Sequence, residues 1–426
     1  MSLSMADWET LTLAQLASPD PHALATGPFG SAISAKYFVD EGVPVIRGSN
    51  LSLDVGVRLN DTGLAFLTPE KADEFDRSIA RRGDLVFTCW GTLGQVGLVD
   101  QRSEFLEYVV SNKQMKMTPD PTRVDSLFLY YLLSAPQMVS QIQQQSLGAA
   151  VPGFNLGQLK ALSVRVPDLQ LQRQISAALG ALDDLIENNR RRVAILEQMA
   201  REIYTEWYVR YRFPGHESAT FVDSPLGSIP DTWMVKELSA VALVNAHSRK
   251  PLDDEVIRYL DISALSEREI GPLTSFVGMD APGRARRVLH AGDTVWAMVR
   301  PNRRAHAYVS HPRLDWIAST GIAVITPASV SSDFLFEAAS TQEFSDHLTS
   351  RATGAAYPAV KPSDFEDTEL IIPDPSTEAA FTKAVGPMHE MVWQLREQSS
   401  SLAQIRDLLL PKLVTGQIDV SSLNLS

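Results

Sequence analysis

The chain has 426 residues, with 38 Lys and Arg against 51 Asp and Glu, which gives a formal net charge of -13. This length allows two or three domains, and 44% hydrophobic with 21% charged residues is the composition of a globular protein. No stretch approaches the roughly 20 apolar residues of a membrane span. The single Cys89 excludes a disulfide framework, and Met1 to Trp8 lacks the basic and apolar parts of a secretory signal. Membrane, disordered and disulfide-rich secreted proteins are excluded, and a cytoplasmic location is expected.

Residues 5–168 are predicted to form the first α+β globule. Short β-type runs at 43–46, 83–88 and 162–166 are separated by many Gly and Pro residues. This pattern is typical of short strands that are joined by turns.

A long amphipathic helix is predicted to follow at 169–212. Its apolar positions recur in alternating steps of four and three, with Asn189 as one polar break, which is the spacing of a heptad seam. The seam consists of Ile175, Leu179, Leu182, Ile186, Val193, Leu196, Ala200, Ile203 and Trp207. At 1.5 Å per residue, the run from Ile175 to Arg210 would span roughly 54 Å. The helix is therefore expected to act as a spacer.

The same plan then occurs a second time. Residues 213–230 are rich in Pro and Gly and predict a linker. Residues 231–374 are predicted to form a second α+β globule, and residues 375–420 are predicted to form a second helix. The second seam has polar breaks at Ser399 and Arg406 and consists of Phe381, Val385, Met388, Val392, Leu395, Leu402, Leu409 and Leu413. Since neither helix can bury its apolar stripe alone, the two are expected to pair as an antiparallel coiled coil.

Short matches in constant order support this internal repeat. The sequence GAAVP at 148–152 recurs as GAAYP at 354–358, and VPD at 166–168 recurs as IPD at 372–374, both at an offset of 206 residues. Further matches, with offsets that drift from 209 to 225, pair Gly83-Asp84 with Gly292-Asp293, Val45-Ile46-Arg47 with Val256-Ile257-Arg258, and Trp8 with Trp233. The drift indicates that loops of different length are carried on one framework.

The sequence lacks the motifs of the common catalytic sites. It has no Gly-rich loop followed by Lys and Ser or Thr, and no G-x-G-x-x-G motif. It also lacks the Asn-Pro-Pro or Asp-Pro-Pro loop of amino-methyltransferases, which act on a flipped base. No acid-x-Lys nuclease element and no metal-ligand spacing of histidines is present. The chain by itself is therefore expected to bind rather than to catalyse, with no metal site and no bound cofactor.

Basic and amide side chains gather around the two Gly-Asp pairs. Those of the first globule are Arg47, Arg81, Arg82, Thr92, Gln95, Asn112, Lys113, Gln114 and Lys116, and those of the second are Arg258, Arg284, Arg286, Arg287, Arg300, Asn302, Arg303, Arg304 and His306. Arg, Asn and Gln match base edges in the major groove of DNA, whereas Lys suits phosphates. All of these residues are candidate DNA-binding residues.

Two roles are expected within the second group. Base readout is assigned to Arg300, Arg303 and Arg304, which follow the Gly-Asp strand in a Pro-Asn turn. Phosphate contacts are assigned to Arg284, Arg286 and Arg287, because they precede the strand on a stretch that reads as looser and more solvated. An alternative stays open, in which these arginines only pair with surface carboxylates. Neither globule is basic overall, with 13 basic and 18 acidic residues in 1–168 and 14 and 20 in 231–374.

In this order, the features of the whole chain resemble the specificity subunit of a type I restriction–modification system. The resemblance rests on the two Gly-Asp strands, the G-A-A-x-P and V/I-P-D motifs, the helix entry QRQI at 172–175, the linker, and the motif PKLVTG at 411–416. It implies two target-recognition domains, each reading one half of a bipartite asymmetric DNA sequence, and antiparallel helices that fix the gap between the halves.

The resemblance also implies partners and cofactors. The partners would be double-stranded DNA, two methyltransferase subunits that use S-adenosylmethionine, and restriction subunits that use ATP and Mg. One departure concerns the recognition loops, where the second copy has RPNR at 300–303 and the first has GTLG at 91–94. Such a difference is expected if the halves read different bases.

Two other functions stay open at this point. A non-enzymatic coiled-coil scaffold or adaptor without DNA specificity would have the same helices and globules. A fused enzyme that both recognises and methylates DNA would need a catalytic domain, for which the chain has no room.

Overall fold

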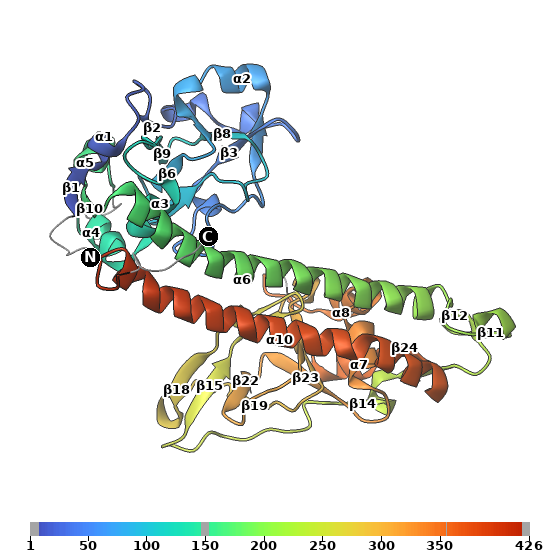
Figure 1. Ribbon diagram of the computed structural model, residues 1–426. Helices are drawn as coiled ribbons and strands as arrows, with labels where there is room; N and C mark the ends of the chain where they lie inside the picture. The colour runs from blue at the N-terminus through green and yellow to red at the C-terminus, as the bar shows by residue number, and fades with distance from the viewer. Residues whose placement is uncertain (1–7, 146–152, 355, 420–426) are drawn as a thin grey trace. The chain divides into compact units, whose positions relative to one another are not determined.

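The computed structural model describes residues 8–145, 153–354 and 356–419 (Figure 1). They belong to two compact units, unit 1 with residues 1–188 and 398–426 and unit 2 with residues 189–397. The predicted α+β class is confirmed, whereas the five predicted domain bounds stay a prediction. The first G-A-A-x-P sequence, at 148–152, lies outside the described residues.

Unit 1 contains two four-stranded sheets and one strand pair. One sheet has the order β2-β9-β6-β7, and the other has the order β4-β3-β8-β5. The bounds are β2 (Leu24–Thr26), β3 (Val43–Ile46), β4 (Ala65–Leu67), β5 (Ile79–Arg81), β6 (Leu85–Thr88), β7 (Val96–Leu98), β8 (Glu107–Val110) and β9 (Gln114–Met117). The strand pair joins β1 (Glu9–Thr12) to β10 (Ser163–Val166). The β-type runs predicted from the sequence correspond to β3, β6 and β10.

Short helices cover the sheets of unit 1. Asp125 caps α3 (Ser126–Ser134) by accepting a hydrogen bond from the Phe128 amide, and α3 packs against β7. The other short helices are α1 (Leu13–Leu16), α2 (Pro69–Asp73), α4 (Pro136–Gln144) and α5 (Leu156–Ala161).

Unit 2 repeats the two four-stranded sheets and the strand pair of unit 1, and it adds the short two-stranded sheet of β16 and β17. Its sheets have the orders β14-β23-β20-β21 and β18-β15-β22-β19, and β13 pairs with β24. The bounds are β13 (Met234–Glu237), β14 (Ala242–Val244), β15 (Val256–Leu260), β16 (Leu265–Ser266), β17 (Glu269–Ile270), β18 (Thr274–Val277), β19 (Ala285–Val288), β20 (Asp293–Ala297), β21 (His306–Val309), β22 (Trp316–Ser319), β23 (Ile322–Pro327), β24 (Glu369–Ile372), α7 (Ser332–Ala339), α8 (Gln342–Arg351) and α9 (Pro362–Glu366). The internal repeat is therefore confirmed as a repeated fold.

Strand register changes one of the sequence matches. Val45 of β3 is opposite Val109 of β8, and Tyr259 of β15 is opposite Ile317 of the equivalent strand β22, so Val45 and Tyr259 hold equivalent positions. The first residue after each strand, Arg47 or Asp261, is the N-cap of a 3-10 turn. Arg47 therefore corresponds to Asp261, and the predicted match of Arg47 with Arg258 is wrong by three residues.

The two long helices are α6 (Leu169–Tyr204), which continues as a π-helical turn to Val209, and α10 (Pro375–Leu413). All seam positions predicted from the heptad spacing are buried or half-buried. In unit 1, Leu171, Ile175 and Leu179 share a core with Leu410 and Leu413 of α10. In unit 2, Ala200 of α6 shares a core with Phe381 and Val385. Early residues of α6 thus meet late residues of α10, and the antiparallel pairing is confirmed.

The predicted linker contains a hairpin of β11 (Phe221–Ser224) and β12 (Gly227–Pro230). Its tight turn has Gly227 at a φ of 101°, a left-handed conformation that suits glycine. Across the described parts of the chain, no helix combines the length and the apolar character needed to cross a membrane.

Replacing Asn189 by Leu is expected to raise the melting temperature of the chain. Asn189 lies buried in the seam, where a polar side chain gives up stability in exchange for a defined helix register. The exposed neighbour offers a matched control, since Asn188→Leu should leave the melting temperature unchanged. Thermal unfolding followed by circular dichroism measures both variants, and a lower melting temperature for Asn189→Leu would contradict this role.

Candidate nucleic-acid interface

A polar groove in unit 1 brings together most of the residues predicted for the first globule. Its lining includes Arg47, Thr92, Gln95, Asn112, Lys113 and Gln114, together with the aromatic rings of Phe38 and Trp90. No Asp or Glu is among the described residues that line it. In a chain with a net charge of -13, this groove is a local surface without carboxylates.

Strand ends position the side chains of the polar groove. Arg47 follows β3 and donates to the Gly63 carbonyl over 2.6 Å. Gln95, just before β7, donates to the Leu51 carbonyl over 2.8 Å and accepts from the Thr88 hydroxyl over 3.0 Å. Lys113 is exposed in the turn between β8 and β9. The backbone thus holds Arg47 and Gln95 in place, while Lys113 projects into solvent.

The corresponding surface of unit 2 is the arginine loop, residues 299–305, between β20 and β21. Asn302 and Arg303 are exposed in this loop. The guanidinium carbon of Arg300 lies 4.7 Å from the ring centroid of Tyr357, at a distance where a cation and an aromatic face attract each other. This loop presents two cations and one amide.

The two loops share a backbone plan although their sequences differ. Gly91 and Gly94 have φ angles of 110° and 90° in unit 1, and Arg300 and Arg304 have φ angles of 54° and 53° in unit 2. Glycine adopts this left-handed region freely, whereas for arginine it costs about 1–3 kcal/mol. Unit 2 therefore keeps arginine at two strained positions of the loop.

Three of the predicted DNA-binding residues are buried. Lys116 donates to the Ile79 carbonyl over 2.8 Å and lies 3.6 Å from Asp84. The Gln114 side chain is fully covered beside the Ser111 hydroxyl. Lys116 and Gln114 thus have little exposure to solvent, although Gln114 lines the polar groove, and their contact with DNA stays a prediction.

His306 is the third buried residue. Its ring stacks on Trp296 with centroids 4.8 Å apart and planes within 9°. Burial lowers the pKa of His306 to about 3, so the ring is neutral at physiological pH. His306 is part of the core of unit 2 and not of its surface.

Several predicted arginines are engaged with other groups of the protein. Arg304 donates to the Gln342 side chain over 2.6 Å and to the Ser340 carbonyl over 2.7 Å, and it pairs with Glu267 at 3.1 Å. Arg258 pairs with Asp315 at 3.3 Å. These arginines hold parts of the fold together, as the alternative interpretation of the sequence expected.

The arginines predicted to contact DNA before each Gly-Asp pair lie in or beside β5 of unit 1 and β19 of unit 2, which are equivalent strands. Arg81 of β5 is 3.4 Å from Glu107 and 3.7 Å from Asp76, and Arg82 beside it is exposed. In unit 2, Arg284 is exposed, whereas Arg286 and Arg287 belong to β19, an edge strand. The expectation of a loose stretch before β20 was therefore wrong, because the segment pairs with β22.

Sequence reasoning missed two aromatic side chains at these surfaces. Trp90 is 49% exposed at the polar groove, and Tyr357 is 70% exposed beside Arg300. Aromatic faces stack on nucleobases and on guanidinium groups. The available signals were the position of Trp90 directly before the glycine loop and that of Tyr357 inside the second G-A-A-x-P motif.

Comparisons with known proteins agree on one family. Residues 29–198 match the protein family described as type I restriction modification DNA specificity domain. The chain is 24% identical over 362 residues to the type I restriction enzyme MjaIX specificity subunit of Methanocaldococcus jannaschii, covering 84% of this chain and 82% of that protein. It is 22% identical over 382 residues to the HindI specificity subunit of Haemophilus influenzae, covering 73% and 81%.

A solved structure has a similar fold. The S subunit of a type I restriction–modification system from M. genitalium matches with a TM-score of 0.58 at 15% identity, covering 95% of this chain and 96% of that one. This likeness supports the architecture of two globules and two long helices.

Arg303→Ala is expected to change the preferred base in one half of a DNA target and to leave the other half unaffected. The loss of one bidentate guanine contact costs about 1–3 kcal/mol, and the exposed Arg303 contributes little to the fold. Arg304→Ala should instead lower the melting temperature, because the Ser340 carbonyl and Glu267 lose their partner. Competition binding with single-base variants of the DNA, together with thermal unfolding, separates the two. An equal loss of affinity for every DNA with Arg303→Ala would assign this residue to phosphate contacts.

Proposed function

We propose that this chain, which belongs to the family of type I restriction–modification specificity subunits, reads a bipartite asymmetric DNA target for a complex that modifies and cuts DNA. Unit 1 would read one half of the target and unit 2 the other. The chain would supply sequence recognition only, and catalysis would belong to its partners.

The observation that carries this proposal is one framework with two different polar surfaces. The strand orders of the two units match, and the loops before β7 and β21 occupy equivalent places between equivalent strands. Unit 1 offers Thr92 and two glycines there, while unit 2 offers Arg300, Asn302 and Arg303. Two copies that read the same bases would need the same side chains, so the difference supports an asymmetric target.

The charge distribution suits a subunit that binds DNA together with partners. Phosphate contacts dominate the affinity of most DNA-binding proteins, and a net charge of -13 opposes them. The polar groove and the arginine loop are local exceptions that provide groups for base edges. We therefore expect most of the phosphate contacts to come from the assembled complex.

A scaffold without DNA specificity has lost its support. The relatives that match most of the chain are named as specificity subunits. The antiparallel helices would serve here as the spacer between the two recognition units.

The partners would be two methyltransferase subunits and the restriction subunits. S-adenosylmethionine, ATP and Mg would be bound by those partners. The complex would act in the cytoplasm, where it meets chromosomal and incoming DNA.

Exposed apolar side chains on one flank of the helix pair support the proposal that two methyltransferase subunits bind. In heptad notation, the position directly before each a position of the seam is called g. Soluble coiled coils usually carry charged side chains at g positions. Leu185 and Met199 of α6, and Met391 and Ile405 of α10, hold such positions and are 37–49% exposed. Leu185 with Met391, and Met199 with Ile405, are separated by the repeat offset of 206 residues.

The exposed apolar flank therefore occurs twice. Unit 1 contributes Leu185, Ile405 and Leu408, and unit 2 contributes Ile195, Met199 and Met391. Antiparallel pairing sets g positions opposite each other, so each set forms one patch. Exposed apolar patches mark protein contacts, and a repeated patch fits two copies of the same partner.

The complete system, expressed in a cell that lacks it, is expected to methylate a bipartite asymmetric sequence. Replacing the arginine loop by the corresponding loop of unit 1 should alter one half of that sequence and keep the other half and the spacer length. Methylome sequencing reads both outcomes. A continuous or symmetric methylated motif would overturn the proposed division of labour.

The double variant Leu185→Glu/Ile405→Glu is expected to reduce the number of bound methyltransferase subunits from two to one. Its two carboxylates would have to be desolvated at the unit 1 patch, whereas the patch of unit 2 is unchanged. Leu314→Glu is the matched control, because Leu314 is 98% exposed and lies outside both patches. Mass photometry of the reconstituted complex gives the stoichiometry, and a complex that still holds two methyltransferase subunits would exclude the flank as their docking site.

A further inference from the structure

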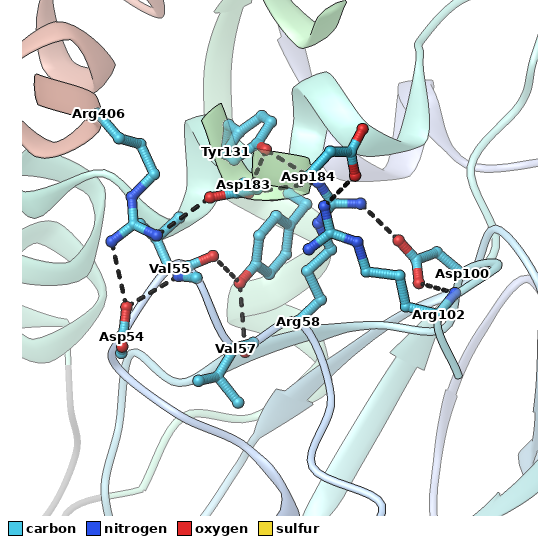
Figure 2. A network of polar contacts seen from close by, with 12 residues as sticks. Asp54, Val55, Val57, Arg58, Asp100, Arg102, Tyr131, Asp183, Asp184 and Arg406 are labelled. Atoms are coloured by element: carbon cyan, nitrogen blue, oxygen red, sulfur yellow. Dashed lines mark hydrogen bonds and ion pairs between the residues drawn. The ribbon is translucent and has the colours of Figure 1, made fainter. Parts of the chain in front are cut away.

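A buried polar cluster joins the globular part of unit 1 to both long helices (Figure 2). Arg58, from the connection between β3 and β4, donates to the Tyr131 hydroxyl of α3 over 3.0 Å and to the Asp183 carboxylate of α6 over 3.3 Å. Tyr131 donates to the same carboxylate over 2.5 Å. From α10, Arg406 donates to the other oxygen of Asp183 over 3.1 Å.

The members of the unit 1 cluster depend on one another because they are removed from water. Arg58, Tyr131, Asp183 and Arg406 are each at most 8% exposed. Burial raises the pKa of Tyr131, so that its hydroxyl stays a donor at every physiological pH. A buried ion is tolerated only when its partners compensate the lost hydration. Asp183 is thus the carboxylate on which both arginines and the phenol converge.

A second cluster holds the globular part of unit 2 against α10. Arg268, between β16 and β17, donates to both oxygens of Glu337 of α7 over 3.0 and 2.6 Å. His389 of α10 lies between two carboxylates, with Nε2 2.8 Å from Glu337 and Nδ1 2.6 Å from Asp333. Only the imidazolium form can donate from both ring nitrogens. His389 is therefore the cation that α10 contributes.

The two clusters occupy equivalent places in the repeat. Tyr131 and Glu337 are each six residues after the N-cap of their helix, and Asp183 and His389 follow the V/I-P-D motif at the same distance, so both pairs have the offset of 206. Arg58 lies between β3 and β4, and Arg268 lies between β15 and β18, which hold equivalent places in the two sheets. Each unit therefore has an arginine from a loop, a residue of the short helix and a residue of the long helix in one buried site.

The charges at these places differ between the units. In unit 1, the long helix supplies the carboxylate, and the short helix supplies a neutral phenol. In unit 2, the short helix supplies two carboxylates, Asp333 and Glu337, and α10 supplies the cation His389, while Glu197 of α6 lies 3.8 Å from Arg268. We propose that this exchange of charges is a docking code, which makes each globular part fit its own segment of the long helices and rejects the other segment.

Exchange of the segments would leave both sites with unbalanced charge. Arg58, which keeps its ion pair with Asp100 at 2.6 Å, would then meet the cation His389 in place of the carboxylate of Asp183. Arg268, Asp333 and Glu337 placed on Asp183 and Arg406 would bring three carboxylates together with two arginines. Since a buried charge without compensation is strongly unfavourable, each wrong pairing is disfavoured. Two globular parts with the same strand order in one chain need such a distinction.

A double-mutant cycle in the full-length chain tests the code. His389→Asp adds a carboxylate beside Asp333 and Glu337 and removes the cation between them, so that Arg268 has to balance the site. This change should speed amide exchange in residues 375–397 and 332–339 by about tenfold or more. Adding Glu337→Tyr recreates the combination of unit 1, arginine with tyrosine and aspartate. The double variant is expected to regain most of the protection that the single variant lost.

Controls separate the code from a general loss of stability. Lys383→Asp adds the same carboxylate at an exposed position of α10 and should not change the exchange rates. His389→Gln removes the charge without adding a carboxylate, and its amide exchange rates should lie between those of the wild type and of His389→Asp. If His389→Asp fails to fold, faster exchange in His389→Gln than in the wild type still tests the proposal. The proposal is overturned if the effects of His389→Asp and Glu337→Tyr simply add, or if His389→Asp leaves exchange unchanged. DNA is absent from this experiment, so its outcome does not depend on the proposed function.

Discussion

The pairing of buried charges between the globular parts and the long helices is the constraint on which the rest of the structure depends. Asp183 and His389 lie on the flank of the coiled coil that faces the globular parts. Asp183 contacts the buried Arg58 directly, and His389 contacts Glu337, to which the buried Arg268 also donates. Such contacts contribute little net stability, but they are unforgiving of a wrong partner. They fix where each globular part sits on its helix segment, and hence which way its recognition surface points.

The opposite flank of the helices is free of that constraint. It carries exposed apolar side chains at repeated positions, such as Leu185 and Met391. One side of the coiled coil is thus specialised for contacts within the chain, and the other suits contacts with partners. This separation lets the recognition loops diverge without disturbing either contact.

The recognition surfaces themselves combine rigid and adaptable parts. Arg304 donates a hydrogen bond to Gln342 and forms an ion pair with Glu267, and these contacts anchor the arginine loop. Arg303, in contrast, projects into solvent. In unit 1, glycines take the strained backbone positions that arginines take in unit 2. Loops at equivalent places between equivalent strands therefore present different side chains.

The sequence by itself determined the repeat, the heptad seams and the antiparallel pairing, because these depend on regular spacing along the chain. It also identified the polar groove in outline, since Arg47, Gln95 and Lys113 do line one surface. Only the tertiary structure decided which polar residues face solvent. His306, Lys116 and Arg304 have the same chemistry as their exposed neighbours, but they contact other parts of the fold. His306 stacks on Trp296 of the paired strand, while Lys116 and Arg304 contact Asp84 and Glu267, which lie more than 30 residues away in the sequence. The docking clusters were hidden for the same reason, because the charge of Arg58 or His389 acquires its role only from partners that the fold brings within hydrogen-bond distance.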